Sequence, residues 1–160
     1  MNKWTVVFIM WAFMLVFSTL YSVYITVEDD EDGIMTNKQL DFYLAMKFPR
    51  AERMIVDAKY FLINKSDVSL YLAKNPINKR RYIDDVYDCD DFAFDLWRGV
   101  RHQYGNIAFG VISINENITS KHCLNFFIDE NKEFYFVEPQ NDKIYKENEM
   151  QYDSVNWLII

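Results

Sequence analysis

The stretch that decides the fold is DCDDFAFDLWRGVRHQYG, which occupies residues 88–105. Its apolar residues recur mainly at intervals of three and four, a spacing that places side chains on one face of a helix. They are Phe92, Ala93, Leu96, Val100 and Tyr104. Asp88 is a residue type that caps helix N-termini, and Gly105 is a type that ends helices. The pattern predicts a helix over residues 89–104 with one apolar face.

After this helix the apolar spacing changes to two, which indicates strands. The predicted strands are 107–114, 122–128 and 133–137, and residues 152–160 are expected to form a last edge strand. The polar residues 129–132 form a turn that joins two of these strands into a hairpin. A helix packed on an antiparallel sheet makes an α+β domain.

Shorter patterns precede this core. Thr36 is placed to cap a helix over residues 37–47, and Ser66 is placed to cap a short helix over residues 66–73. Short extended segments are expected at 54–56 and 60–63.

The composition fits one folded domain. The chain has 160 residues, of which 51% are hydrophobic and 18% aromatic, and this supplies a packed core. We therefore expect disorder only locally, if anywhere along the chain. The net charge of −7 provides no basic surface for nucleic acid, so we expect no nucleic-acid partner.

A second hydrophobic signal lies at the N-terminus, where residues 4–27 carry no charge. A helix of this length spans roughly 36 Å, enough to cross a hydrocarbon core of about 30 Å. Lys3 precedes the segment and acidic residues 28–32 follow it. This asymmetry predicts a cytoplasmic N-terminus and an extracytoplasmic remainder, and Trp and Tyr near both ends fit interfacial belts.

Three interpretations of this segment stay open: an uncleaved anchor, a cleaved signal peptide, and a buried helix of a soluble protein. We favour the anchor because the apolar run is long and has no good cleavage site. The expected organisation is a transmembrane signal-anchor helix over 1–27, an acidic linker over 28–36 and a folded domain over 37–160. The protein would then be a single-pass membrane protein, with the membrane as a partner.

The sequence contains candidate catalytic residues that the predicted fold would bring together. Cys89 begins the predicted helix, where the helix N-terminus favours a thiolate. His122 starts one strand of the hairpin and Glu138 follows the other, so the two ends of the hairpin would meet. These are the parts of a nucleophile, a base and an orienting group. Taken singly, each of these residues is more often structural.

Cys123 supplies an alternative for Cys89, because two cysteines in an exported domain often form a disulfide. Adjacent strand residues point to opposite faces of a sheet. If His122 faces Cys89, then Cys123 is expected to face away as a core or surface thiol. A Cys89–Cys123 disulfide stays open as the alternative, and it would abolish the nucleophile.

Carboxylates flank Cys89 and would oppose thiolate formation if left bare. They belong to Asp88, Asp90 and Asp91. Two explanations stay open. The carboxylates cap the helix and its dipole, or they bind a hard cation such as Ca²⁺. The spacing does not match an EF-hand loop, and a bound cation would reverse their effect on Cys89.

These motifs resemble the papain-like C-terminal domain of the agglutinin of the fungus Marasmius oreades and its bacterial and phage relatives. The matching strings are DCDDFA at 88–93, His122 with Asn125, and VEPQ at 137–140. The resemblance covers about residues 80–142. It implies a papain-like cysteine-peptidase fold with Cys89 as nucleophile, His122 as base and Glu138 as orienting residue. It also implies calcium-dependent activity, with the acidic residues beside Cys89 as ligands.

From these residues we predict a membrane-anchored thiol hydrolase or acyltransferase, similar to cysteine peptidases, that acts on a peptide or protein substrate. Cys89 would attack the carbonyl carbon, and His122 would take the thiol proton and later protonate the leaving amine. The helix N-terminus, with Gln140 as an extra donor, would hold the oxyanion. The alternative is a catalytically inactive papain-like module that binds an envelope protein.

Overall fold

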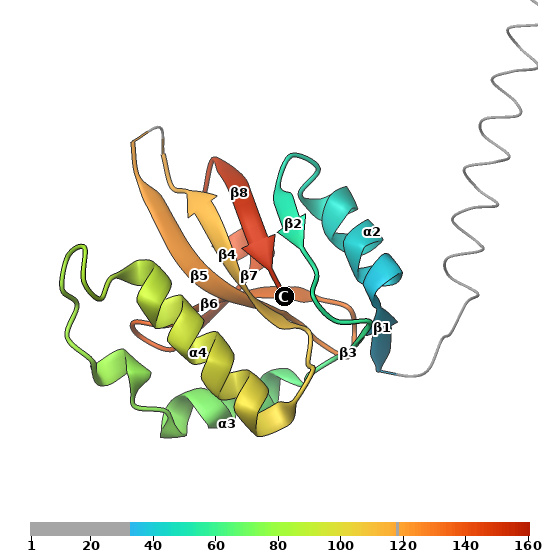
Figure 1. Cartoon of the computed structure of the whole chain (residues 1–160), viewed down its shortest axis with the longest axis horizontal. Coiled ribbons are helices and arrows are strands. Elements are labelled where there is room, and N and C mark those ends of the chain that lie inside the picture. Colours follow the sequence, from blue (N-terminus) through green and yellow to red (C-terminus); the bar gives the residue numbers. More distant parts are fainter. Residues whose placement is uncertain (1–32, 118) are drawn as a thin grey trace, which may run out of the picture. The chain divides into compact units, whose positions relative to one another are not determined.

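A mixed sheet of six strands organises the domain (Figure 1), in the order β2-β8-β4-β5-β6-β7. The structure is a computed structural model that describes residues 33–117 and 119–160. The strands are β2 Glu52–Met54, β4 Phe109–Asn115, β5 Lys121–Ile128, β6 Phe134–Glu138, β7 Lys143–Lys146 and β8 Ser154–Ile159. The pair β2–β8 is parallel, and the other neighbouring pairs of this sheet are antiparallel. Two further strands, β1 Ile34–Thr36 and β3 Lys59–Phe61, pair antiparallel with each other.

Among the described residues, three α-helices accompany the sheet, and their caps follow from local sequence. They are α2 Asn37–Lys47, α3 Lys65–Lys74 and α4 Cys89–Tyr104, with short 3-10 turns η1 Ile77–Lys79 and η2 Glu147–Glu149. Thr36 caps α2 in a capping box with Gln39, as predicted. The α3 cap is Asn64 rather than the predicted Ser66, because the Asn64 side chain accepts the Ser66 N–H at 2.9 Å.

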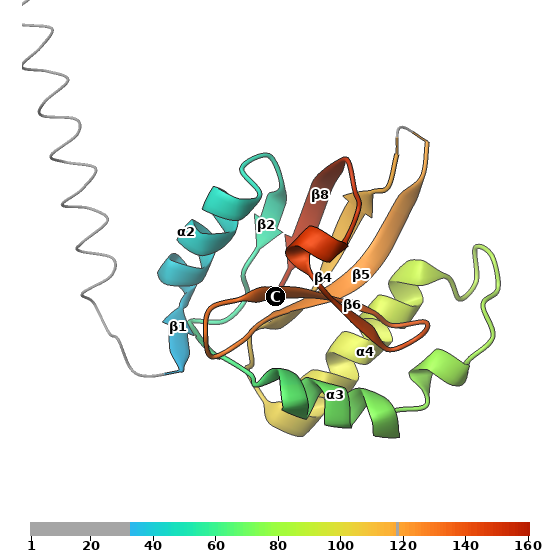
Figure 2. The same cartoon turned by 180° about the vertical axis from the view of Figure 1, so that it is seen from behind.

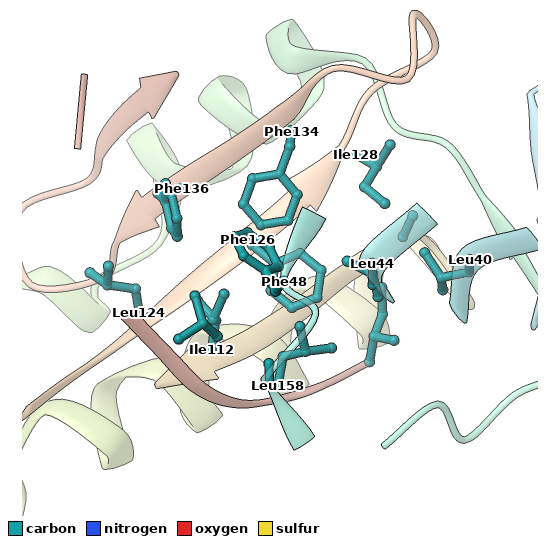
Figure 3. Close-up of a cluster of buried hydrophobic side chains, with 14 of the residues drawn as sticks. Leu40, Leu44, Phe48, Ile112, Leu124, Phe126, Ile128, Phe134, Phe136 and Leu158 are labelled. Carbon is teal, nitrogen blue, oxygen red and sulfur yellow. The ribbon is translucent and has the colours of Figure 1, made fainter. Parts of the chain in front are cut away.

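The helices cover opposite faces of the sheet, and the views from the two sides show this separation (Figures 1 and 2). On the α2 face, Leu40 and Leu44 pack with side chains of the central strands (Figure 3). The strand residues of this cluster include Ile112, Leu124, Phe126, Phe134 and Phe136. On the other face α3 and α4 pack on Phe109, Phe127 and Tyr135. The central strands are therefore buried on both faces, which fixes their register.

The predicted antiparallel sheet covered by one helix is wrong. The sheet is mixed and carries three helices on its two faces. Strand β8, predicted at an edge, lies between β2 and β4, and β7 has no counterpart in the prediction. The reason is that β8 pairs with Glu52–Met54, which lies about a hundred residues earlier in the chain. A pairing over that separation leaves no local periodic signal.

The N-terminal hydrophobic helix predicted over residues 1–27 lies outside the described residues. Among residues 33–117 and 119–160, no helix has both the length and the apolar character needed to cross a membrane. The compact unit that the structure describes begins at Gly33. Residues 34–36, placed by the sequence in an acidic linker, form β1.

Candidate functional site

The first turn of α4 is fixed by its own carboxylates and by a buried amide. The Asp88 side chain accepts the Asp90 N–H at 3.3 Å, and the Asp91 side chain accepts the Asp88 N–H at 3.1 Å. The Asp88 side chain also accepts the Asp91 N–H, and this bond forms a capping box with the one from the Asp88 N–H to the Asp91 side chain. From β5, the buried Asn125 donates through Nδ2 to the carbonyl oxygens of Ala93 at 2.8 Å and Gly110 at 3.1 Å. The start of α4 is thereby tied to the centre of the sheet.

His122 and Glu138 form a shielded pair beside this turn. His122 Nε2 lies 2.6 Å from Glu138 Oε2, and the two side chains are 17% and 13% exposed. The other Glu138 oxygen, Oε1, accepts the backbone N–H of Gln140 at 3.0 Å. Both oxygens of the carboxylate are therefore occupied, which holds the imidazole in one orientation. Gln140, predicted as an oxyanion donor, supplies its main chain to Glu138.

Cys89 meets His122, so the structure brings together the three residues that the sequence singled out. The pKa of Cys89 is lowered to about 4, first by a hydrogen bond from the Cys123 thiol and then by one with His122. Burial lowers the pKa of His122, but hydrogen bonds with Cys89 and Glu138 outweigh it and raise the pKa to about 10. At neutral pH the pair is a thiolate facing an imidazolium.

The prediction that Cys123 faces away from Cys89 is wrong. Cys123 is buried with Ala93 and Val111, and Cys89 packs against this cluster. Its pKa is raised by its hydrogen bond with Cys89 and by burial, so Cys123 keeps its proton and donates it to the thiolate. Both cysteines are free thiols. Along β5, Cys123 lies on the same face as Asn125 and Phe127, which is the face that α4 covers, whereas Leu124 and Phe126 lie on the α2 face.

The predicted cation ligands are arranged differently from the expectation. Asp88, Cys89 and Asp90 hold ligand atoms within 4.8 Å of one another. Asp91, the third predicted ligand, instead accepts the Asp88 N–H. Ca²⁺ takes six to eight oxygen ligands, and this cluster offers two carboxylates beside a sulfur, which is a poor fit. Helix capping accounts for the hydrogen bonds, and calcium binding stays a prediction.

A concave region between α3 and α4, the α3–α4 groove, has no signal in the sequence. It has a volume of about 400 Å³ and is lined by Leu70, Tyr71, Lys74, Asn75, Pro76, Gln103 and Tyr104. The Tyr71 and Tyr104 rings meet edge to face, with centroids 6.0 Å apart. Asn75 Nδ2 is buried and has no hydrogen-bond partner among the described residues. Because the lining comes from two separate helices, no single segment of sequence signals it.

Comparisons with known proteins place the fold. No protein-family model matches the chain, and no curated protein matches it. Among solved structures, the chain is similar to PSL1a in complex with E64, with a TM-score of 0.69 and 18% identity. It is also similar to Polyporus squamosus lectin bound to the epitope Neu5Acα2-6Galβ1-4GlcNAc, with a TM-score of 0.68 and 18% identity. Each alignment covers 80% of this chain and 51% or 50% of the neighbour, so the chain spans about half of either protein.

These findings correct the resemblance drawn from the motifs. One of the two similar structures is Polyporus squamosus lectin, and neither is described as a peptidase. The papain-like assignment of the fold is therefore replaced by similarity to a lectin structure. The thiol hydrolase interpretation, with its peptide or protein substrate, is overturned by the same neighbours. The alternative of a binding module fits them better.

Proposed function

We propose that the described domain is a binding module whose ligand is a glycan. The observation that carries this proposal is the fold shared with Polyporus squamosus lectin, which was solved with a sialylated trisaccharide. The similarity extends over 80% of this chain. Because the chain spans about half of that neighbour, its ligand has to be argued from its own surface and tested directly.

The α3–α4 groove has the aromatic surface that a sugar ring needs. A pyranose presents C–H groups on its faces and hydroxyl groups around its edge, so it packs on aromatic rings and hydrogen-bonds at its rim. Tyr71 and Tyr104 line the groove with half-buried rings. The Tyr104 hydroxyl is held by the Asp67 carbonyl oxygen at 3.3 Å. One ring is therefore fixed in place before a ligand arrives.

Polar groups in the same groove are free to bind a ligand. The Asn75 Oδ1 atom accepts the Ile77 N–H at 2.9 Å, while Nδ2 has no partner among the described residues. A buried donor without a partner costs free energy, and a ligand hydroxyl would relieve it. Lys74 is exposed and forms no ion pair within the part of the chain that the structure describes. Its ammonium group suits the carboxylate of a sialic acid.

The test is a titration of the full chain with Neu5Acα2-6Galβ1-4GlcNAc. Calorimetry and ligand-observed NMR measure the binding. We expect saturable binding that weakens in Tyr104→Ala and in Asn75→Ala. The matched control is Tyr82→Ala, because Tyr82 is 48% exposed and lies outside the groove. If the wild type binds the trisaccharide and neither groove variant weakens this binding, the glycan binds at another surface.

E64 and the trisaccharide are the ligands named for the two similar structures. A parallel titration with E64 shows which of them this chain binds. Binding of the trisaccharide supports the proposal whatever E64 does. Binding of E64 without binding of the trisaccharide or of other glycans on an array would overturn it. That outcome would mean that the half shared with the lectin is not the half that holds its glycan.

A further inference from the structure

The two cysteines of the chain lie against each other where α4 meets β5. Cys89 packs on the buried cluster that contains Cys123, Ala93 and Val111, and the two thiols are hydrogen-bonded. Both belong to elements that are held in place, because Asn125 ties Ala93 of α4 to the sheet. Figure 1 shows α4 lying along this part of the sheet. Their contact is therefore a fixed property of the fold.

The two thiols differ in their access to solvent. Cys89 is half-buried beside the exposed Asp90, whereas Cys123 is only 8% exposed. A small oxidant reaches Cys89 first, and Cys123 is already in contact with the sulfur that would be oxidised. An accessible cysteine with a neighbouring resolving cysteine is the arrangement used for reversible thiol oxidation.

We propose that Cys89 and Cys123 form a reversible disulfide on reaction with a peroxide. The Cys89 thiolate attacks one peroxide oxygen, the O–O bond breaks, and the leaving oxygen takes a proton to become water or an alcohol. Sulfur is oxidised to a sulfenic acid while the peroxide is reduced. The Cys123 sulfur then attacks the Cys89 sulfur, the S–O bond breaks, and hydroxide leaves as water with the Cys123 proton.

The disulfide changes the surroundings of His122. Oxidation removes the thiolate that the imidazole faces, while the 2.6 Å contact with Glu138 Oε2 remains. The covalent link also joins the first residue of α4 to β5. The site therefore has two covalent states, and this inference is independent of any glycan bound in the α3–α4 groove.

The experiment treats the reduced full chain with hydrogen peroxide and follows it by intact-mass measurement and peptide mapping. We expect the wild type to lose both free thiols and two hydrogens, with a peptide linking Cys89 to Cys123. Dithiothreitol should restore both thiols. In Cys123→Ser we expect a sulfenic acid at Cys89 that a dimedone probe traps, because no resolving thiol is present.

Cys89→Ser is the matched control, and its Cys123 should stay unmodified at the same peroxide dose. Near-ultraviolet circular dichroism of each reduced variant shows that it is folded before oxidation. Wild-type protein that goes to a sulfinic acid at Cys89 while Cys123 stays a free thiol would overturn the proposal. Disulfides formed only between chains would overturn it as well.

Discussion

The two ends of α4 present different chemistry on one helix. At its start, Cys89, His122 and Glu138 form a chain of charged and hydrogen-bonded groups. At its other end, Gln103 and Tyr104 face Tyr71 and Asn75 of α3 across an open groove. At the first end His122 is held by Glu138, whereas at the second the buried Asn75 Nδ2 has no partner among the described residues. This unpartnered amide and the Tyr71 and Tyr104 rings are why we assign binding to the groove.

The largest expected effect is a loss of stability that disturbs the sheet beneath both ends of α4. A Cβ added at Gly110 would lie 2.3 Å from the Ile159 carbonyl oxygen and 2.6 Å from the Phe126 ring. Backbone on one side and a buried ring on the other leave no space, so Gly110→Ala should cost about 3 kcal/mol. Urea denaturation checks this value. A change under about 1 kcal/mol would mean that β4 and β8 separate easily.

The pH dependence of alkylation tests the charged end alone. Because the pKa of Cys89 is lowered to about 4, its thiolate is present at higher pH and is lost only as the pH falls through that value. Iodoacetamide should therefore react with Cys89 at a nearly constant rate from about pH 5.5 to 8, whereas an ordinary thiol gains almost tenfold per unit. A low pKa also reduces intrinsic nucleophilicity, so the profile is more informative than the rate.

The control for this profile is His122→Ala, which removes the imidazolium partner. We expect the alkylation rate of Cys89 in this variant to rise with pH across the same range. Peptide mapping separates Cys89 from Cys123, whose pKa is raised. A wild-type profile that climbs with pH like that of a free thiol would contradict the thiolate–imidazolium pair.

Local sequence patterns predicted the charged end well. The helix 89–104 has the predicted bounds, with Asp88 as its cap and Gly105 after its last residue. The predicted hairpin is also present, since β5 pairs with β6 and Asn125 lies opposite Val137. Helix caps and hairpins depend on residues that are close in sequence, so local sequence patterns predict them. The contact of His122 with Glu138 follows from that hairpin.

Features that depend on distant segments were not predictable. The parallel pair β2–β8 joins residues 52–54 to 157–159, and neither segment signals the other. The α3–α4 groove likewise combines Tyr71 with Tyr104, which the sequence pattern assigned to an apolar helix face. Cys123 was misplaced because the prediction did not place it on the face of β5 that α4 covers. In each case the deciding contact is tertiary.

The groove end is tested by a substitution that leaves the charged end intact. A Cβ added at Gly99 would lie 2.2 Å from the Tyr71 hydroxyl oxygen, which is the far end of a side chain that can move. Gly99→Ala should displace this ring and weaken trisaccharide binding roughly tenfold, equivalent to about 1.4 kcal/mol. Calorimetry measures the affinity, and the alkylation profile of Cys89 should not change. A change in that profile would mean that the two ends are coupled through α4.

The cap of α4 tests how much the charged end contributes to stability. Asp88→Ala removes the acceptor for the Asp90 N–H and should cost about 1 kcal/mol, whereas Asp88→Asn keeps an acceptor and should cost less. Urea denaturation of both variants measures the difference. Equal losses in the two variants would assign the effect to the charge of Asp88 rather than to its hydrogen bond.

The smallest expected effect is that of calcium at the same turn. The Asp88 and Asp90 side chains lie close enough for hydrogen bonding between them to raise the pKa of Asp90 to about 6, so a cation there would relieve some repulsion. The cluster supplies few oxygen ligands, so we expect weak binding, with a stabilisation of about 0.4 kcal/mol when the calcium concentration equals the dissociation constant. Thermal melts with Ca²⁺ and with Mg²⁺ measure it, and Asp90→Asn is the matched variant because Asp90 lies outside the capping box. A rise in melting temperature that Asp90→Asn abolishes would make the turn a calcium site. If calcium changes the melting temperature of neither protein, the carboxylates of this turn only cap the helix.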